Sequence, residues 1–198
     1  MSAKDRTMSG CDAIVIGASS GGVEALLAIL PALRKGIGVP VFVVLHMPRT
    51  RRSELASLFN SRCALPVREA EDKQPVVPGT VYFAPSDYHA LIDCGPRIAL
   101  SVDGPVNHSR PSIDVLFESA ADIYAGRLLG VILTGANEDG AAGLAAIHRA
   151  GGQTMVQLPG SAVSPQMPAA ALLRVPSSRV LTLAGIAKVL HCLRPLQA

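Results

Sequence analysis

The chain of 198 residues has no tryptophan, only 4% aromatic residues and only 17% charged residues. No apolar run approaches the roughly 18 residues of a membrane-spanning helix, and residues 1–10 are too polar for a secretory signal. We therefore expect no membrane insertion and a cytoplasmic location. The formal net charge of +3 is too small to indicate a nucleic-acid partner.

Cysteine is also scarce. The four cysteines, Cys11, Cys63, Cys94 and Cys192, form no CxxC pair, which argues against a zinc site and against a disulfide framework. With 49% hydrophobic residues the chain can bury a sizeable core, so we expect a polar tail over residues 1–11 and one domain over residues 12–198.

Apolar runs alternate with helical patterns along most of the chain, which predicts an α/β fold: a doubly wound, mostly parallel sheet with helices on both faces. Gly79–Pro85 and Arg97–Ser101, with Gly, Asp and Pro between them, predict a small antiparallel excursion near residues 79–101. The other expected strands are 13–16, 39–45, 66–69, 128–134 and 154–157, and expected helices include 53–62, 168–173 and 184–193.

A turn of small residues, Gly17-Ala18-Ser19-Ser20-Gly21, joins the first expected strand to the first expected helix. The pattern Gly-x-Ser-x-Gly is typical of a nucleophile elbow, in which a serine is exposed on a sharp turn between a strand and a helix. It matches neither a dinucleotide fingerprint nor a phosphate-binding loop. The structural alternative is a plain turn that uses small residues for close packing.

Ser19, His46 and Asp139 follow the three most apolar strands. The carboxyl ends of parallel strands share one edge of the sheet, so the three side chains should lie on one rim. There an imidazole can take the proton of a serine hydroxyl, and a carboxylate can orient that imidazole. Each residue also has a structural interpretation: His46 as a strand cap, Asp139 as the N-cap of the next helix. The order Ser, His, Asp differs from that of α/β-hydrolases.

Several further motifs stand in order along the chain. They are Leu45-His46-Met47-Pro48, Ala70-Glu71-Asp72, Pro78-Gly79-x-Val81-Tyr82-x-Ala84-Pro85, Gly104-Pro105-Val106-Asn107, Arg110-Pro111-Ser112-x-Asp114 and Leu133-Thr134-Gly135 with Asp139-Gly140-Ala141-Ala142-Gly143. Together with the Ser19 turn they resemble the catalytic domain of CheB-type protein-glutamate methylesterases of bacterial chemotaxis, from about Asp12 to Leu193.

The resemblance implies hydrolysis of γ-glutamyl methyl esters on chemoreceptors and deamidation of receptor glutamines. It implies Ser19 as nucleophile, His46 as base, Asp139 as the partner of His46, and the backbone at Ala136 as a donor to the oxyanion, with no metal or cofactor. The backbone N–H of Ser20, at the start of a helix, is our own candidate for a second donor.

The chain departs from the family pattern at two places. Ala136-Asn137-Glu138 stand where the family usually has Met-Gly, and Leu158-Pro159 follow Gln157 where the family usually has an acidic residue. The family's receiver domain has no counterpart in the short polar tail, so a separate receiver protein is a candidate partner. These departures keep two alternatives open: a catalytically weak receptor-binding or regulatory module of the same fold, and a small-molecule esterase.

Two other groups of residues lie near the expected rim. Arg49, Arg51 and Arg52 follow His46 and would either attract an acidic receptor surface or remain solvated. His89 is a candidate to line the same cleft.

Overall fold

The computed structural model describes residues 10–47 and 55–193. Its middle layer is a seven-stranded parallel sheet, in the order β3-β4-β2-β1-β7-β8-β9. Its strands are β1 (Ala13–Ala18), β2 (Val41–Leu45), β3 (Val67–Glu69), β4 (Val81–Phe83), β7 (Leu128–Ile132), β8 (Gln153–Gln157) and β9 (Arg179–Leu181). A separate antiparallel pair consists of β5 (His89–Asp93) and β6 (Arg97–Ser101).

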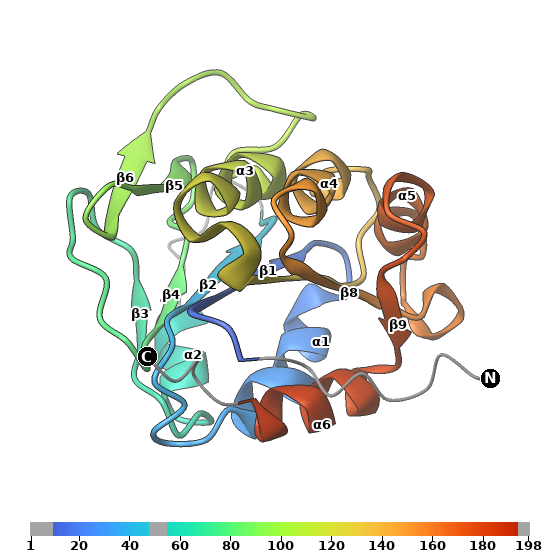
Figure 1. Ribbon diagram of the computed structural model, residues 1–198, viewed down its shortest axis with the longest axis horizontal. Helices are drawn as coiled ribbons and strands as arrows, with labels where there is room; N and C mark the ends of the chain where they lie inside the picture. The colour runs from blue at the N-terminus through green and yellow to red at the C-terminus, as the bar shows by residue number, and fades with distance from the viewer. Residues whose placement is uncertain (1–9, 48–54, 194–198) are drawn as a thin grey trace.

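Helices cover both faces of the sheet, as the sequence predicts (Figure 1). One face carries α1 (Gly22–Ile29), α2 (Leu55–Asn60) and α6 (Leu183–Cys192), and the other carries α3 (Ile113–Tyr124), α4 (Ala141–Arg149) and α5 (Gln166–Arg174). Short 3-10 turns complete the chain: η1 (Leu30–Ala32), η2 (Ala125–Arg127) and η3 (Pro159–Ser161).

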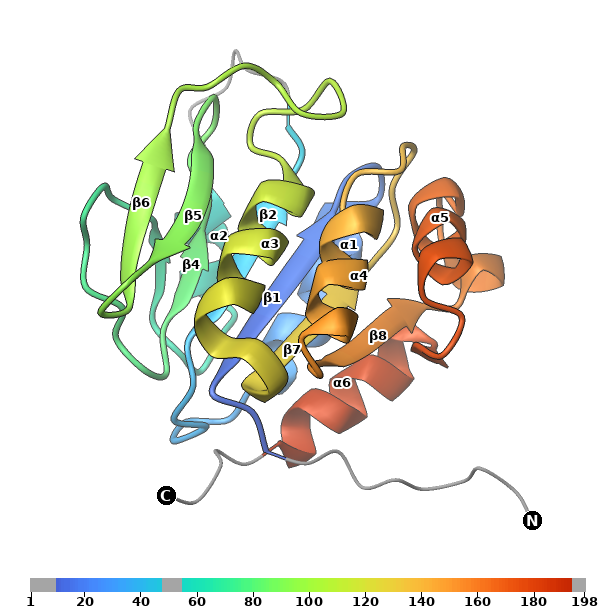
Figure 2. The same ribbon diagram turned by 45° about the horizontal axis from the view of Figure 1, so that its top comes forward.

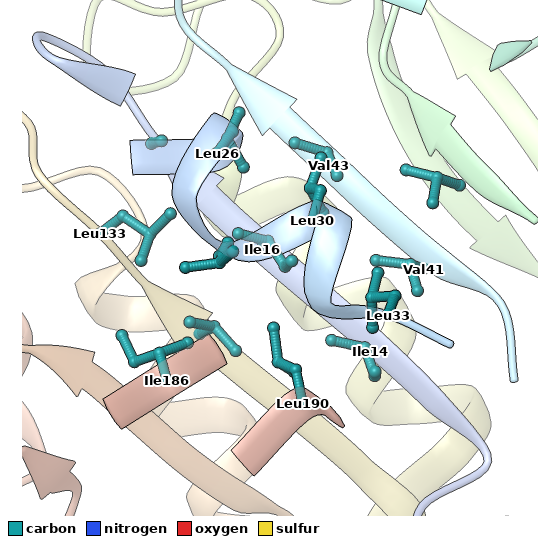
Figure 3. Packing of buried hydrophobic residues seen from close by; sticks show 14 of the residues in the cluster. Ile14, Ile16, Leu26, Leu30, Leu33, Val41, Val43, Leu133, Ile186 and Leu190 are labelled. Carbon is teal, nitrogen blue, oxygen red and sulfur yellow. The ribbon is translucent and has the colours of Figure 1, made fainter. Parts of the chain in front are cut away.

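The central strand β1 is buried along its whole length because its side chains alternate between two cores. Ile14 and Ile16 belong to the core under α1 and α6, where Figure 3 shows Ile16 near Leu26 and Leu30. Ala13 and Val15 belong to the core under α3 and α4. This double burial explains the continuous apolar run, and it holds β1 rigidly between its neighbours.

The antiparallel excursion within residues 79–101 is confirmed, but the expected strand Gly79–Pro85 is not part of it. This segment contains β4, which pairs in parallel with β2 and β3 in the main sheet. The true antiparallel partner of β6 is β5, which packs beside α3. A strand of three residues carries no local signal of its direction, because direction depends on which strand it joins.

The chain order of the strands reverses at β1, which pairs with β2 on one side and with β7 on the other. Ligands of such sheets bind outside the carboxyl ends of the strands at this switch point. Figure 2 shows the loop from β6 to α3 at the same end of the molecule as the first turns of α3 and α4. Within the described residues, no helix is both long and apolar enough to cross a membrane.

Candidate active site

Ser19 and His46 stand side by side in the register of the sheet. Ala18 of β1 pairs with Leu45 of β2, and the amide of His46 donates to the carbonyl of Ala18 over 3.0 Å. The next residue on each strand is Ser19 and His46, so the two leave the sheet at neighbouring strand ends, where parallel strands lie about 4.8 Å apart. The sequence prediction that they share one rim is confirmed by this pairing.

The Ser19 turn is fixed from both sides. The amide of Gly22 donates to the Ser19 carbonyl over 2.7 Å, and Gly21 has a left-handed φ of 75° that favours glycine. Thr134, just after β7, accepts a hydrogen bond from the Ser19 amide at 2.9 Å, and its Oγ1 donates to the Ser20 carbonyl at 2.8 Å. The turn is therefore tied to the ends of both β1 and β7.

Asp139 meets His46 across this rim. The Nε2 of His46 lies 2.8 Å from Oδ2 of Asp139, and the His46 side chain is 12% exposed whereas that of Asp139 is fully buried. A nitrogen that faces an ionised carboxylate carries the proton, so the neutral ring has its lone pair on Nδ1. That nitrogen is the one available to act as a base.

The Asp139 carboxylate is surrounded by donors from the start of α3. Besides His46 it accepts hydrogen bonds from the amide of Ile113 at 2.6 Å, the amide of Asp114 at 3.2 Å and the hydroxyl of Ser112 at 2.8 Å. Burial alone would raise the pKa of Asp139, but the hydrogen bonds from His46, Ile113 and Ser112 outweigh burial and lower this pKa. The carboxylate is therefore held ionised at a helix N-terminus, where negative charge is favoured.

The sequence offered a structural interpretation of Asp139 as an N-cap, and the position of its carboxylate shows that this interpretation is wrong. Asp139 is not the N-cap of the helix that follows it, because Gly140 occupies that position of α4 with a left-handed φ of 95°. Its carboxylate instead caps α3, a helix that begins 26 residues earlier in the chain.

Comparison with known proteins places the chain in a family. The family model for the CheB methylesterase domain matches residues 14–190. This chain belongs to the CheB methylesterase family. The crystal structure of the Thermotoga maritima CheB methylesterase catalytic domain superimposes with a TM-score of 0.87 at 34% identity, covering 93% of this chain and 98% of that one.

Two curated relatives differ in how much of their own length this chain covers. A Leptospira interrogans protein is 43% identical over 178 residues, which is 90% of this chain and 92% of that protein. The Bordetella parapertussis protein-glutamate methylesterase/protein-glutamine glutaminase is 41% identical over 179 residues, which is 88% of this chain but 51% of that protein. The predicted membership of the CheB methylesterase family is thus confirmed by the family model and by these relatives.

The remaining predicted residues of this CheB-family site lie at the exposed end of the rim. Ser20 and Ala136 are both exposed, and the backbone N–H of neither has a hydrogen-bond acceptor among the described residues. Within those residues, no hydrogen bond joins the Ser19 hydroxyl to His46. The hydroxyl of Ser109 lies 3.4 Å from Nδ1 of His46.

Sequence reasoning missed four residues around the His46–Asp139 pair: Asn107, Ser109, Ser112 and Asp114. Asn107 donates from Nδ2 both to Asp139, at 3.2 Å, and to Asp114, at 2.8 Å. Ser112 is the N-cap residue of α3. Asn107, Ser112 and Asp114 lie in motifs that carried the family resemblance, whereas Ser109 lies between two of those motifs. Ser and Asp at a helix start are ordinary capping signals. What the sequence did not indicate was that these groups gather around the hydrogen-bonded pair of His46 and Asp139.

His89 does not line the cleft as predicted. It is only 2% exposed, its Nδ1 accepts the amide of Ser112 at 3.1 Å, and its Nε2 donates to the carbonyl of Gly104 at 3.1 Å. His89 therefore braces the start of α3 from behind. Arg49, Arg51 and Arg52 lie outside the described residues.

Leu158, the first residue of the second departure, is exposed. It opens the segment 158–165, in which Val163 is 73% exposed and lies against the Ser19 turn, since a Cβ on Gly21 would be 2.7 Å from that of Val163. Val163 thus places an apolar side chain on the border of the rim, beside the Ser19 turn. Across residues 10–47 and 55–193, no cluster of three metal-ligating side chains is present.

Proposed function

We propose that this chain hydrolyses γ-glutamyl methyl esters of chemoreceptors, with Ser19 as nucleophile, His46 as general base and Asp139 as the group that orients His46. The observation that carries the proposal is the bond between Nε2 of His46 and the buried carboxylate of Asp139, which leaves Nδ1 on a rim that Ser19 shares. The ionised Asp139 favours the imidazolium that forms when His46 takes a proton.

The first half of the reaction forms an acyl-enzyme. The Ser19 oxygen attacks the ester carbonyl while its proton passes to Nδ1 of His46. The tetrahedral intermediate then breaks its bond to the methoxy oxygen, which receives the proton from His46 and leaves as methanol. In the second half a water molecule, deprotonated by His46, attacks the acyl carbon, and Ser19 leaves with that proton, releasing a glutamate.

Deamidation of a receptor glutamine follows the same two steps, with ammonia in place of methanol as the leaving group. The curated Bordetella relative is named for both activities. Because an amide nitrogen must be protonated before it leaves, the same His46 serves as the acid.

Two backbone N–H groups are available to stabilise the negative oxygen of the tetrahedral intermediate. The amide of Ser20 lies next to the nucleophile, and the amide of Ala136 lies in the loop after β7; each is without an acceptor among the described residues. Main-chain donors of this kind are preorganised and stronger for the developing oxyanion than for the ground-state carbonyl. A main-chain donor does not depend on the side chain, so Ala136 in place of methionine is compatible with this role.

The test is release of labelled methanol from a chemoreceptor carrying tritiated methyl esters on its glutamates. We expect release by the wild-type protein and none above background by Ser19→Ala. Ser177→Ala, which removes an exposed hydroxyl remote from the rim, should retain the wild-type rate. A folded wild-type protein that binds this receptor and releases no methanol would favour the binding-module alternative, and turnover of free small esters alone would favour the small-molecule esterase.

A further inference from the structure

Asp114 is a buried carboxylate that the reaction described above does not use. Only 6% of the residue is exposed. Its Oδ1 accepts the amide of Gly143, in the first turn of α4, at 2.7 Å, and its Oδ2 accepts Nδ2 of Asn107 at 2.8 Å. Both oxygens of Asp114 are therefore committed to donors on other segments.

The side-chain amide of Asn107 connects Asp114 with the reacting groups. The same Nδ2 that donates to Asp114 also donates to Oδ1 of Asp139, at 3.2 Å. An amide nitrogen has two hydrogens, so one is used for each carboxylate. Asn107 itself has a left-handed φ of 48°, in the loop between β6 and α3. These two hydrogen bonds fix the orientation of the Asn107 side-chain amide.

A second connection runs through the helices. Asp114 lies in the first turn of α3 and binds the first turn of α4, while Asp139 lies just before α4 and binds the first turn of α3. Each carboxylate thus satisfies amides at the start of the other helix, amides that would otherwise be unpaired. A displacement of α4 relative to α3 would move Asp139 relative to His46.

We propose that Asp114 is a positioning residue of this hydrolase: through Asn107 and the first turn of α4 it holds the Asp139 carboxylate in line with His46. The inference rests on the proposed function, because it gives Asp139 its catalytic role. Among the described residues no hydrogen bond joins the Asp114 carboxylate to Ser19 or His46, so this carboxylate acts on the reacting groups through Asp139.

The charge on Asp114 is titratable near neutral pH. Burial raises its pKa to about 6; the hydrogen bonds from Gly143 and Asn107 act against this rise, and the charges of Asp139 and Glu118 add to it. Asp114 also lines a cavity of about 150 Å³ together with Glu138 and Arg174, so its carboxyl can exchange protons with solvent. On the β5 side the neighbouring titratable group is His89, which is bonded to Ser112 and not to Asp114.

Protonation should loosen the arrangement. A neutral carboxyl group is a poorer acceptor than a carboxylate, so it holds the two donors of Asn107 and Gly143 less firmly. The positioning role therefore predicts that the ionised form of Asp114 is the active one, and that turnover falls when Asp114 gains its proton.

The experiment is the pH profile of kcat for methanol release from the methyl-labelled receptor. The positioning role adds the deprotonation of Asp114 to that of the general base, so log kcat of the wild-type protein should fall on the acid limb with a slope steeper than 1. In Asp114→Asn the slope should return to 1 and the plateau should drop roughly tenfold, the effect of losing a charged hydrogen bond, with KM changed far less.

A matched variant changes the pKa of Asp114 without touching the network. Glu118 is exposed and lies one turn further along α3, and its charge raises the pKa of Asp114. Glu118→Gln should leave the plateau at the wild-type value and shift the steep part of the acid limb to lower pH. A merely structural role for Asp114 would leave the acid limb of Glu118→Gln where it is in the wild type.

Two results would overturn the proposal: an acid limb of slope 1 in the wild type, or an Asp114→Asn variant with the wild-type profile. If Asp114→Asn does not fold, an NMR pH titration of the wild-type protein tests the proposal instead. The His46 ring resonances should then show an inflection at the midpoint at which the Asp114 carboxyl carbon titrates, and its absence would equally overturn the proposal. Failure of the proposed function is separate, since it appears as methanol release by Ser19→Ala or as no release by the folded wild-type protein.

Discussion

The carboxylates of Asp139 and Asp114 cap each other's helices. Asp139, two residues before α4, accepts the amide of Ile113 at the start of α3, and Asp114, in the first turn of α3, accepts the amide of Gly143 at the start of α4. Asp139, which orients His46, thereby also connects α3 with α4. Substitutions of Asp139 should therefore change catalysis and stability together.

The first prediction concerns Asp139→Asn. An amide in place of the carboxylate keeps one oxygen but turns an NH2 group toward donors such as the amide of Ile113. We expect kcat to fall on the order of a thousandfold or more, since the imidazolium loses its counter-charge, and the melting temperature to fall as well.

The measurements are methanol release and thermal unfolding by circular dichroism. Asp93→Asn, at the exposed turn between β5 and β6, is the control that should change neither. If Asp139→Asn loses activity but keeps the wild-type melting temperature, the hydrogen bonds from the start of α3 to Asp139 do not contribute to the stability of the fold.

Much of this arrangement could be predicted from the sequence. The three strand-end residues Ser19, His46 and Asp139 were predicted because apolar runs identify parallel strands, and parallel strands bring their carboxyl ends to one edge. The residues around Asp139 were not predicted, because their contacts depend on how α3 packs against α4. Asn107 is the clearest case. Its left-handed backbone conformation and its two hydrogen bonds, one to each carboxylate, arise only in the folded loop.

The second prediction concerns the pH dependence of stability. Asp114 has a folded-state pKa raised from 3.8 to about 6, so its contribution to stability is present below pH 3.8 and is lost as pH rises through 6. Asp139 has a lowered pKa, so its contribution is present above its unfolded value and is lost as pH falls through its folded value.

Urea unfolding between pH 4 and 7 separates the contribution of Asp114 to stability from that of Asp139. Relative to Asp114→Asn, the wild-type free energy of unfolding should decline as pH rises over this range, by at most about 1.4 kcal/mol per pH unit. Parallel pH curves for the two proteins would contradict the raised pKa of Asp114.

The third prediction concerns the approach of α3 to β1. A Cβ added to Gly17 would lie 2.4 Å from Cγ2 of Ile113, at the start of the helix that Asp139 caps. We expect Gly17→Ala to lower the free energy of unfolding by about 1–3 kcal/mol through overpacking, and to reduce kcat by displacing the first turn of α3.

Gly160→Ala is the matched control, because nothing lies within 4 Å of the Cβ it would add. We expect Gly160→Ala to have the wild-type free energy of unfolding, measured by chemical denaturation, and the wild-type kcat for methanol release. An unchanged kcat in a destabilised Gly17→Ala protein would separate the packing of α3 from the alignment of the site.

The fourth prediction concerns the apolar border of the rim. Val163 is 73% exposed against the Ser19 turn, so a protein substrate that reaches Ser19 would cover it. Val163→Ser should raise KM for the methylated receptor by up to about tenfold, the effect of one buried valine, and change kcat less. Val77→Ser, also exposed but outside this segment, should leave KM unchanged. An equal KM in Val163→Ser and wild type would exclude this border from the substrate contact.

The identity of the nucleophile is the central claim, because Ser109 also lies near His46, with its Oγ 3.4 Å from Nδ1. The most direct measurement is mass-spectrometric mapping of the serine that an alkyl fluorophosphonate modifies in the wild-type protein. We expect modification of Ser19 in the wild type, its loss in His46→Ala, and its persistence in Ser109→Ala. Modification of Ser109 in the wild type, with methanol release retained in Ser19→Ala, would contradict it.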